Sequence, residues 1–211
     1  MKKAKDAKAP ARPDLGQTGG LLLTPLPQQV TIAGQPWPIQ ADFRVSIQFE
    51  LLLQDRTLAD SAKAEKALAL YYPQQPPDLK EAVAQLLWFY RCGEAAASPP
   101  GPQGKAAGAG RVYHFAYDGP YFYAAFLSQY GIDLLDVPFL HWWKFRALFR
   151  ALSSETELMK IMGYRAMPLA PELTREQRRH YQQLKALYAL PDLRSEAEKE
   201  RDFGEALACL F

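Results

Sequence analysis

Cysteine is scarce in this chain: among 211 residues only Cys92 and Cys209 carry a thiol. A disulfide-stabilised fold needs a larger set of paired cysteines, so we expect a protein of a reducing cytoplasm. Long apolar runs are missing as well. The three leucines at 21–23 are too few for a signal peptide and are followed closely by Pro25 and Pro27. Because no run approaches the roughly 20 residues of a membrane span, we expect neither an export signal nor a membrane anchor.

A strong charge of one sign is also absent. The net charge is +2, and the excess lies in residues 1–20, where five basic side chains accompany two acidic ones. The remaining body is therefore almost neutral, whereas a protein that binds phosphate groups presents a basic face. This distribution disfavours nucleic-acid binding. The alternative stays open for two basic stretches, the tail 1–20 and the neighbourhood of Arg178.

Sequence motifs for chemistry are lacking too. His114, His141 and His180 lie far apart, and none has a second histidine or a cysteine at the spacing of metal ligands. No nucleophile elbow, paired-carboxylate motif or dinucleotide fingerprint occurs. The glycines of residues 94–110 lack the Gly-Lys-Ser/Thr ending of a phosphate loop. We therefore expect a protein that binds no cofactor and no metal and is not an enzyme. Residues that converge only in space, however, leave no linear motif.

Large aromatic side chains are abundant, with 11 Tyr, 11 Phe and 4 Trp. The densest stretch, residues 139–152, reads Phe-Leu-His-Trp-Trp-Lys-Phe-Arg-Ala-Leu-Phe-Arg-Ala-Leu. At about 100° per residue it is apolar on nearly every side, which is typical of a buried central helix. Asp136 is expected to cap this helix, and Pro138 suits its first turn.

One mixed face of the expected central helix collects two aromatic and two basic side chains. Arginine over tryptophan suggests a cation–π contact, and either of two interpretations fits the face. It is the edge of a buried helix with arginines extended toward water, or it is a patch that meets a partner. The candidate partner-binding residues are Phe139, Trp143, Arg146 and Arg150.

Helical periodicity continues through most of the chain and predicts an all-α helical bundle with a small N-terminal β-hairpin around Gly34. The expected helices span 43–54, 58–71, 79–90 and 121–130, with Asp42, Asp78 and Asp118 as expected caps of the first, third and fourth. In the helix 79–90 the apolar side is expected to hold Leu79, Val83, Leu86, Leu87 and Tyr90. Three more helices are expected to open with the capping-box pairs Ser154–Glu157, Thr174–Gln177 and Ser195–Glu198. Residues 112–117 are expected to be extended. Tyr181, Leu184, Leu187 and Tyr188 are expected to point inward from the helix after Thr174.

Composition divides the chain into four parts. Residues 1–27 are expected to form a disordered basic tail rich in Pro and Gly, and residues 94–110 a flexible Ala/Gly/Pro linker. Residues 28–93 hold the hairpin and the first helices. Residues 111–211 are expected to form a second helical part that packs with 28–93 as one domain.

Five sequence blocks resemble the bacteriophage gene-product-fifteen family, which is found in siphoviral tail modules and in prophages of Gram-positive bacteria. The block His-Trp-Trp-Lys-Phe-Arg-Ala-Leu-Phe at 141–149 is the most specific, and the resemblance runs from about Val30 to Arg194. The other four blocks are Pro-Ile-Gln-Ala-Asp-Phe-Arg at 38–44, Leu-Trp-Phe-Tyr at 87–90 with Cys92 and Gly93, Tyr-Phe-Tyr-Ala-Ala-Phe-Leu-Ser-Gln-Tyr-Gly-Ile-Asp at 121–133, and Ile-Met-Gly-Tyr-Arg at 161–165.

This resemblance implies a role in tail morphogenesis, because genes of the family lie near those for the major tail protein and the tape-measure protein. That is the position of tail assembly chaperones, which coat the tape-measure helix until tail-tube subunits replace them. It implies the tape-measure protein and the major tail protein as partners, together with a homo-oligomer. It also implies a prophage-encoded protein of the host cytoplasm that is absent from the mature virion. A structural tail or virion component and a nucleic-acid-binding phage protein are the alternatives.

Overall fold

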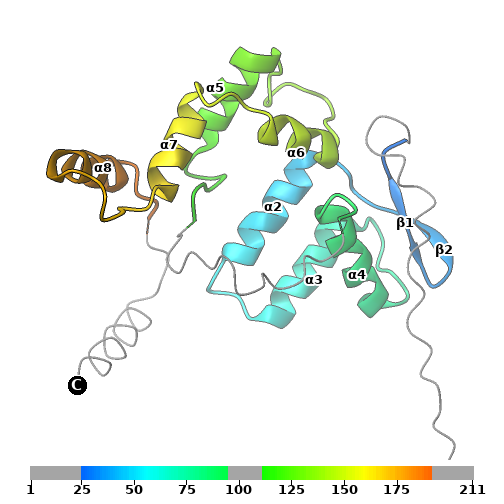
Figure 1. Ribbon diagram of the computed structural model, residues 1–211. Helices are drawn as coiled ribbons and strands as arrows, with labels where there is room; N and C mark the ends of the chain where they lie inside the picture. Colours follow the sequence, from blue (N-terminus) through cyan, green and yellow to red (C-terminus); the bar gives the residue numbers. More distant parts are fainter. Residues whose placement is uncertain (1–24, 95–110, 192–211) are drawn as a thin grey trace, which may run out of the picture.

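A computed structural model describes residues 25–94 and 111–191, and the structural statements below concern these two ranges. Seven helices and one two-stranded sheet form their regular structure (Figure 1), so the predicted all-α class with a small N-terminal hairpin is confirmed. The elements are β1 (Gln29–Ile32), β2 (Gln35–Pro38), α2 (Phe43–Gln54), α3 (Asp60–Tyr71), α4 (Leu79–Tyr90), α5 (Gly119–Tyr130), α6 (Trp142–Arg150), α7 (Glu157–Ala166) and α8 (Arg175–Leu187).

The hairpin pairs β1 with β2 in antiparallel register around a two-residue turn. Both turn residues, Ala33 and Gly34, have positive φ angles of 51° and 73°, the conformation that matches the twist of a tight hairpin. A two-stranded hairpin is marginally stable alone, and this one packs on α4. Val30 and Ile32 are buried, and the Ala33 N–H donates to the Glu81 carboxylate of α4 at 2.7 Å.

The first three helices lie side by side, with α3 between α2 and α4 (Figure 1). Asp42 caps α2 by accepting the Arg44 N–H, and Asp78 caps α4 by accepting the Glu81 N–H, as the sequence predicts. The contact between α2 and α3 contains a buried polar pair: the Tyr71 hydroxyl donates to Ser46 Oγ at 2.8 Å. This hydrogen bond lets a serine occupy a fully buried position.

Phe145 of α6 lies at the centre of the core and is fully buried. Its ring stacks on Phe43 of α2 and on Phe126 of α5, with centroid distances of 5.0 and 4.9 Å. The ring of Trp142 stacks on it as well, at 5.6 Å. The core is therefore shared between the chain before residue 94 and the chain after residue 111, with α6 as the element that joins them.

The central helix is shorter than predicted, because it begins at Trp142 instead of residue 139. The residues before it form an antiparallel bridge with the chain before α2. In this bridge the Trp142 N–H donates to the Ala41 carbonyl at 2.8 Å, and the Phe43 N–H donates to the Leu140 carbonyl at 2.9 Å. Because that backbone is extended, His141 caps the helix by accepting the Trp143 N–H, and Asp136 does not cap it.

Two predicted caps in the second half of the chain are also wrong. Thr156, and not Ser154, caps α7. Asp118 lies at the start of α5, but its carboxylate makes no capping hydrogen bond, because it binds Arg165 and the His114 N–H. Residues 112–117 form turns instead of an extended segment.

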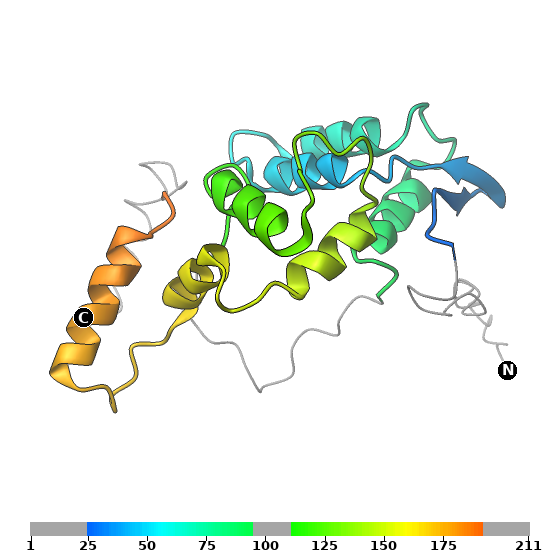
Figure 2. The same ribbon diagram turned by 90° about the horizontal axis from the view of Figure 1, so that it is seen from above.

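The last described helix, α8, lies at the opposite end of the molecule from the hairpin (Figures 1 and 2). Thr174 and Gln177 form the predicted capping box. The prediction that four residues of this helix point inward is wrong for Leu187, which is 72% exposed. The other three are half-buried, and α8 has no fully buried residue. The helix packs on α7 as its main neighbour, so one side of it meets no other described element closely. The helix predicted after Ser195 lies outside the described residues.

Candidate partner-binding surface

Side chains of α6 cover the C-terminal end of α4. Trp142 and Trp143 donate their indole N–H groups to the carbonyls of Tyr90 and Phe89, each at 2.8 Å. Arg146 donates to the Tyr90 carbonyl at 3.1 Å. The last carbonyls of a helix lack partners within the helix and carry partial negative charge, so indole donors and a guanidinium are favourable there. Trp143 and Arg146 are thus part of the contact between the two halves of the core.

The predicted arginine–tryptophan contact exists, but with a different tryptophan from the one on the predicted face. The Arg146 guanidinium lies over Trp142, 5.8 Å from the ring centroid. Trp143 instead packs edge-on against Trp88, with centroids 5.6 Å apart. Gly93 lies under this pair with a φ of 77°, and a Cβ there would come within 3.1 Å of the Trp143 ring. Glycine therefore fits both the backbone conformation and the space.

The other two candidate residues are more accessible. Arg150 forms an ion pair with Glu94 at 3.0 Å, and both side chains are exposed. Phe139 lies before the helix and is 50% exposed. The structure therefore brings Trp143 and Arg146 together at the end of α4. Phe139 lies before α6 begins, so its predicted place on a common helical face is wrong, and its ring packs edge-on against His141 with centroids 6.4 Å apart. The contact of the four candidate residues with a partner stays a prediction.

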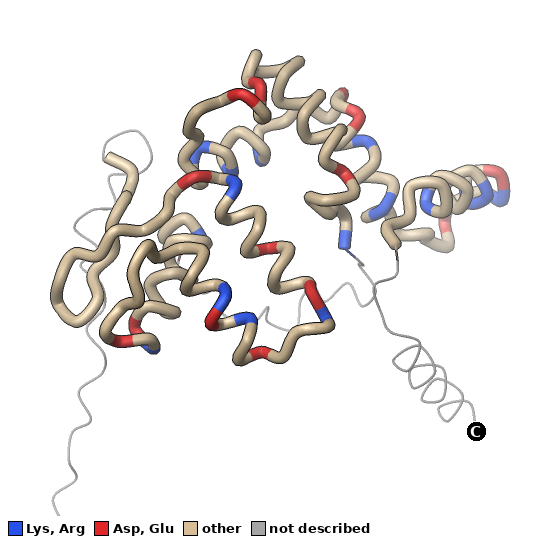
Figure 3. Tube along the Cα trace, turned by 180° about the vertical axis from the view of Figure 1, so that it is seen from behind, with Lys and Arg blue, Asp and Glu red and all other residues tan. Residues whose placement is uncertain are grey.

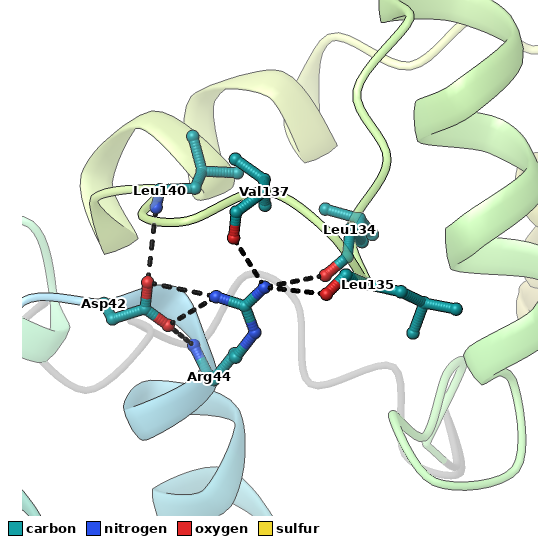
Figure 4. A network of polar contacts seen from close by, with 6 residues as sticks. All are labelled: Asp42, Arg44, Leu134, Leu135, Val137 and Leu140. Carbon is teal, nitrogen blue, oxygen red and sulfur yellow. Dashed lines mark hydrogen bonds and ion pairs between the residues drawn. The ribbon is translucent and has the colours of Figure 1, made fainter.

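The loop that carries Phe139 also exposes Leu135, a residue that the sequence did not single out. Leu135 is 77% exposed, the largest exposed fraction among the large apolar side chains of the described chain. Its backbone is held from below by Arg44 (Figure 4), whose Nη2 donates to the carbonyls of Leu134 and Val137 at 3.0 and 2.8 Å. The Asp133 carboxylate accepts the Leu135 N–H at 2.9 Å. The apolar tip therefore has a fixed shape.

A groove of about 860 Å³ runs between α3 and α4. Leu68 and Val83 are half-buried in it, and Tyr72 joins its two walls by donating its hydroxyl to the Ala82 carbonyl at 2.8 Å. Leu79 lies 45% exposed on the α4 wall. The groove is lined by Ser61, Ala64, Glu65, Leu68, Ala69, Tyr72, Pro73, Gln75, Pro76, Leu79, Lys80 and Val83.

Positions of Lys and Arg are interspersed with positions of Asp and Glu along the described chain (Figure 3). On α8, exposed Arg175 and Arg179 have an exposed glutamate, Glu176, on the same helix. Two further basic side chains of this helix are engaged within the protein: Arg178 donates to the carbonyls of Leu169 and Ala170, and Lys185 donates to those of Arg165 and Met167.

The buried ionisable groups serve the packing. Burial raises the pKa of Glu50, whose carboxylate accepts the Tyr90 hydroxyl at 3.0 Å. Burial lowers the pKa of His141, which caps α6 and has its Nε2 2.9 Å from the Pro27 carbonyl. His114 likewise has a pKa lowered by burial, and its Nδ1 accepts the Ala116 N–H. Within residues 25–94 and 111–191, no three His, Cys, Asp or Glu side chains are grouped so that they could hold a metal ion.

No helix in the described part of the chain has both the length and the apolar composition that crossing a membrane requires. The fold and this surface define a mainly helical protein with an apolar groove and a rigid apolar loop. Over residues 22–190 the sequence matches the family described as Bacteriophage Gp15 protein. The chain belongs to this family, so the expected resemblance is confirmed and the protein is a phage protein. Neither the curated proteins nor the solved structures compared with it gave a match.

Proposed function

We propose that this phage protein is a tail assembly chaperone that binds the tape-measure protein in the host cytoplasm and does not catalyse a reaction. The observation that supports the proposal best is an apolar groove between two helices on a member of the phage family. A long helical protein exposes an apolar stripe that aggregates when it is left bare. A groove between helices shields such a stripe by binding its apolar face.

The proposed role also requires release, because tail-tube subunits must replace the chaperone. Many copies that each bind weakly meet this requirement, since avidity holds the assembly while single contacts exchange. The open groove and the rigid loop with Leu135 suit weak, repeated contacts because neither encloses a ligand deeply. A homo-oligomer along the tape-measure helix, with the major tail protein as the displacing partner, is part of the proposal.

Co-expression with the tape-measure protein of the same phage tests the proposal. The tape-measure protein is expected to be insoluble alone and soluble in a complex that co-purifies with this chain. The matched control is co-expression of the tape-measure protein with an unrelated helical protein of similar size. A tape-measure protein that stays insoluble, with no complex recovered, would contradict the proposal.

The two alternative roles give different results in two further experiments. Mass spectrometry of purified particles should not detect this chain if it is a chaperone, whereas stoichiometric amounts would identify a virion component. A nucleic-acid-binding protein would give a salt-dependent gel shift that is lost when residues 1–20 are deleted. The nearly neutral body disfavours this second alternative.

A further inference from the structure

We infer that the groove between α3 and α4 binds one amphipathic helix of the partner, oriented by Glu65 on one wall and Lys80 on the other. The inference rests on the proposed function, because the helix is taken to belong to the tape-measure protein. The partner helix has an apolar stripe, a basic side chain that faces α3 and an acidic side chain that faces α4. The groove is thus the docking site, and the four residues predicted from the sequence are not required for it.

The groove has the apolar surface and the length that a helix needs. Half-buried Leu68 and Val83 lie within it, and exposed Ala64, Ala69 and Leu79 lie along its edges. The lining residues run from Ser61 to Tyr72 on the α3 side, about 16 Å at 1.5 Å per residue, whereas on α4 they are confined to its N-terminal end, from Leu79 to Val83. A partner segment of about three turns therefore fits along the α3 wall and contacts α4 at its N-terminal end.

The backbone of the walls decides between a helical and an extended partner. The peptide groups of α3 and α4 are already paired within each helix, so they offer no strand edge to an added chain. An extended segment in this groove would leave its own N–H and C=O groups without partners on an apolar surface. A helix satisfies these groups internally and presents only side chains to the groove.

The charges on the two walls give the docking its direction. Glu65 and Lys80 are exposed, and the described ion pairs include neither of them. Lys80 lies in the first turn of α4, where the helix end itself is partially positive, so an acidic partner residue is favoured there. A partner helix that runs in the opposite direction along the groove places like charges together on both walls, so this direction is disfavoured.

Three variants test the groove by co-purification with the tape-measure protein and by the Kd of the complex. Leu79→Glu places a charge at the edge of the groove, in the first turn of α4, where an acidic residue is compatible with the helix. The double variant Glu65→Lys with Lys80→Glu reverses both wall charges at exposed positions. The matched control is Leu187→Glu, which makes the same change at a leucine that is 72% exposed on α8, outside both the groove and the loop with Leu135. Unchanged thermal unfolding of each variant shows that the fold is intact.

The expected result is at least a tenfold higher Kd for Leu79→Glu and for the charge-reversed variant, with Leu187→Glu close to the wild type. The effect of charge reversal should shrink at high salt, because exposed charges are screened. If the wild type binds but the groove variants bind equally well, the groove is not the docking site while the proposed function stands. If Leu79→Glu instead abolishes a dimer of this chain, the groove binds a second copy and the inference is wrong. If the wild type forms no complex at all, the proposed function and the inference both fail.

Discussion

Arg165 and Asp118 form a buried, two-pronged ion pair, with Nη1–Oδ2 at 2.6 Å and Nη2–Oδ1 at 2.9 Å. The pair connects three parts of the second half of the chain, because Arg165 also donates to the carbonyls of Val112 and Tyr188. It thereby joins the segment before α5 to α7 and to the end of α8. The shared contacts explain why Asp118 is buried at a helix start without capping the helix.

Asp118→Ala should lower the free energy of unfolding by about 3–5 kcal/mol, because it leaves the Arg165 guanidinium buried without a counter-charge. Urea unfolding measures this change. Glu155→Ala is the matched control, since the ion pair of Glu155 with Lys160 is solvent-exposed and should contribute less than about 1 kcal/mol. A loss of similar size for both variants would show that the buried pair has no special role.

Trp143→Ala should lower the free energy of unfolding by about 3 kcal/mol, because it removes packing on Trp88 and a hydrogen bond to the Phe89 carbonyl. Thermal and urea unfolding measure the stability, and co-purification with the tape-measure protein measures the binding. Partner binding that falls more than stability would place Trp143 in the partner surface. An equal loss of both would assign it to the core.

Arg150→Ala separates binding from folding on the same helix. Because its ion pair with Glu94 is exposed, its removal should change the stability by less than about 1 kcal/mol. A weaker complex with the tape-measure protein would then report a direct contact. An unchanged Kd would remove Arg150 from the candidate partner-binding residues.

The stability of the protein should fall as the pH drops below about 6.5, the ordinary pKa of histidine. Burial lowers the pKa of both His141 and His114 in the folded protein, so the unfolded chain binds protons first as the pH falls. In each case Nδ1 accepts a backbone N–H, which protonation would prevent. Urea unfolding at a series of pH values from about 5 to about 8, on both sides of that pKa, measures how the free energy of unfolding depends on pH.

His141→Asn is the informative variant for this pH dependence. Asparagine caps a helix well but does not titrate, so the variant should fold and should show a shallower loss of stability toward low pH. His180→Asn changes an exposed histidine on α8 and serves as the control. An unchanged pH profile in His141→Asn would show that His141 does not cause the effect.

Arg44→Lys should loosen the loop that presents Leu135 without unfolding the core. A lysine ammonium cannot reproduce the planar fork with which Arg44 reaches the carbonyls of Leu134 and Val137 and the Asp42 carboxylate. Amide hydrogen exchange at residues 133–137 should become about tenfold faster, a change of about 1.4 kcal/mol in local stability. Arg179→Lys, at an exposed position on α8, should leave this exchange unchanged. Equal exchange in both variants would show that Arg44 does not hold the loop.

The sequence predicted the helices best where their ends are set by neighbouring residues. Asp42, Asp78 and the Thr174–Gln177 box cap their helices through contacts within four residues, and these are visible in the pattern. The start of α6 was missed because residues 140–142 pair with residues 41–43, about 100 positions away. The ion pair of Asp118 was missed for the same reason, since its partner Arg165 is distant in the sequence.

The candidate surface was predicted less completely than the fold. Leu79 and Val83 were assigned to the apolar side of their helix, and their helical spacing is correct. The side that is buried, however, is centred on Ala82, Leu86 and Phe89, so the groove wall remains accessible. A groove needs two helices, and the periodicity of one helix does not reveal which of its apolar residues a neighbour leaves uncovered.

The antiparallel bridge of residues 41–43 with residues 140–142 has a practical consequence. Together with the Phe43–Phe145 stack, it holds the two described ranges to each other without help from the backbone that joins them. A protein nicked between residues 94 and 111 should therefore stay assembled as a two-fragment complex. The same site should accept an inserted reporter peptide, so this phage protein can be followed during infection with its core intact.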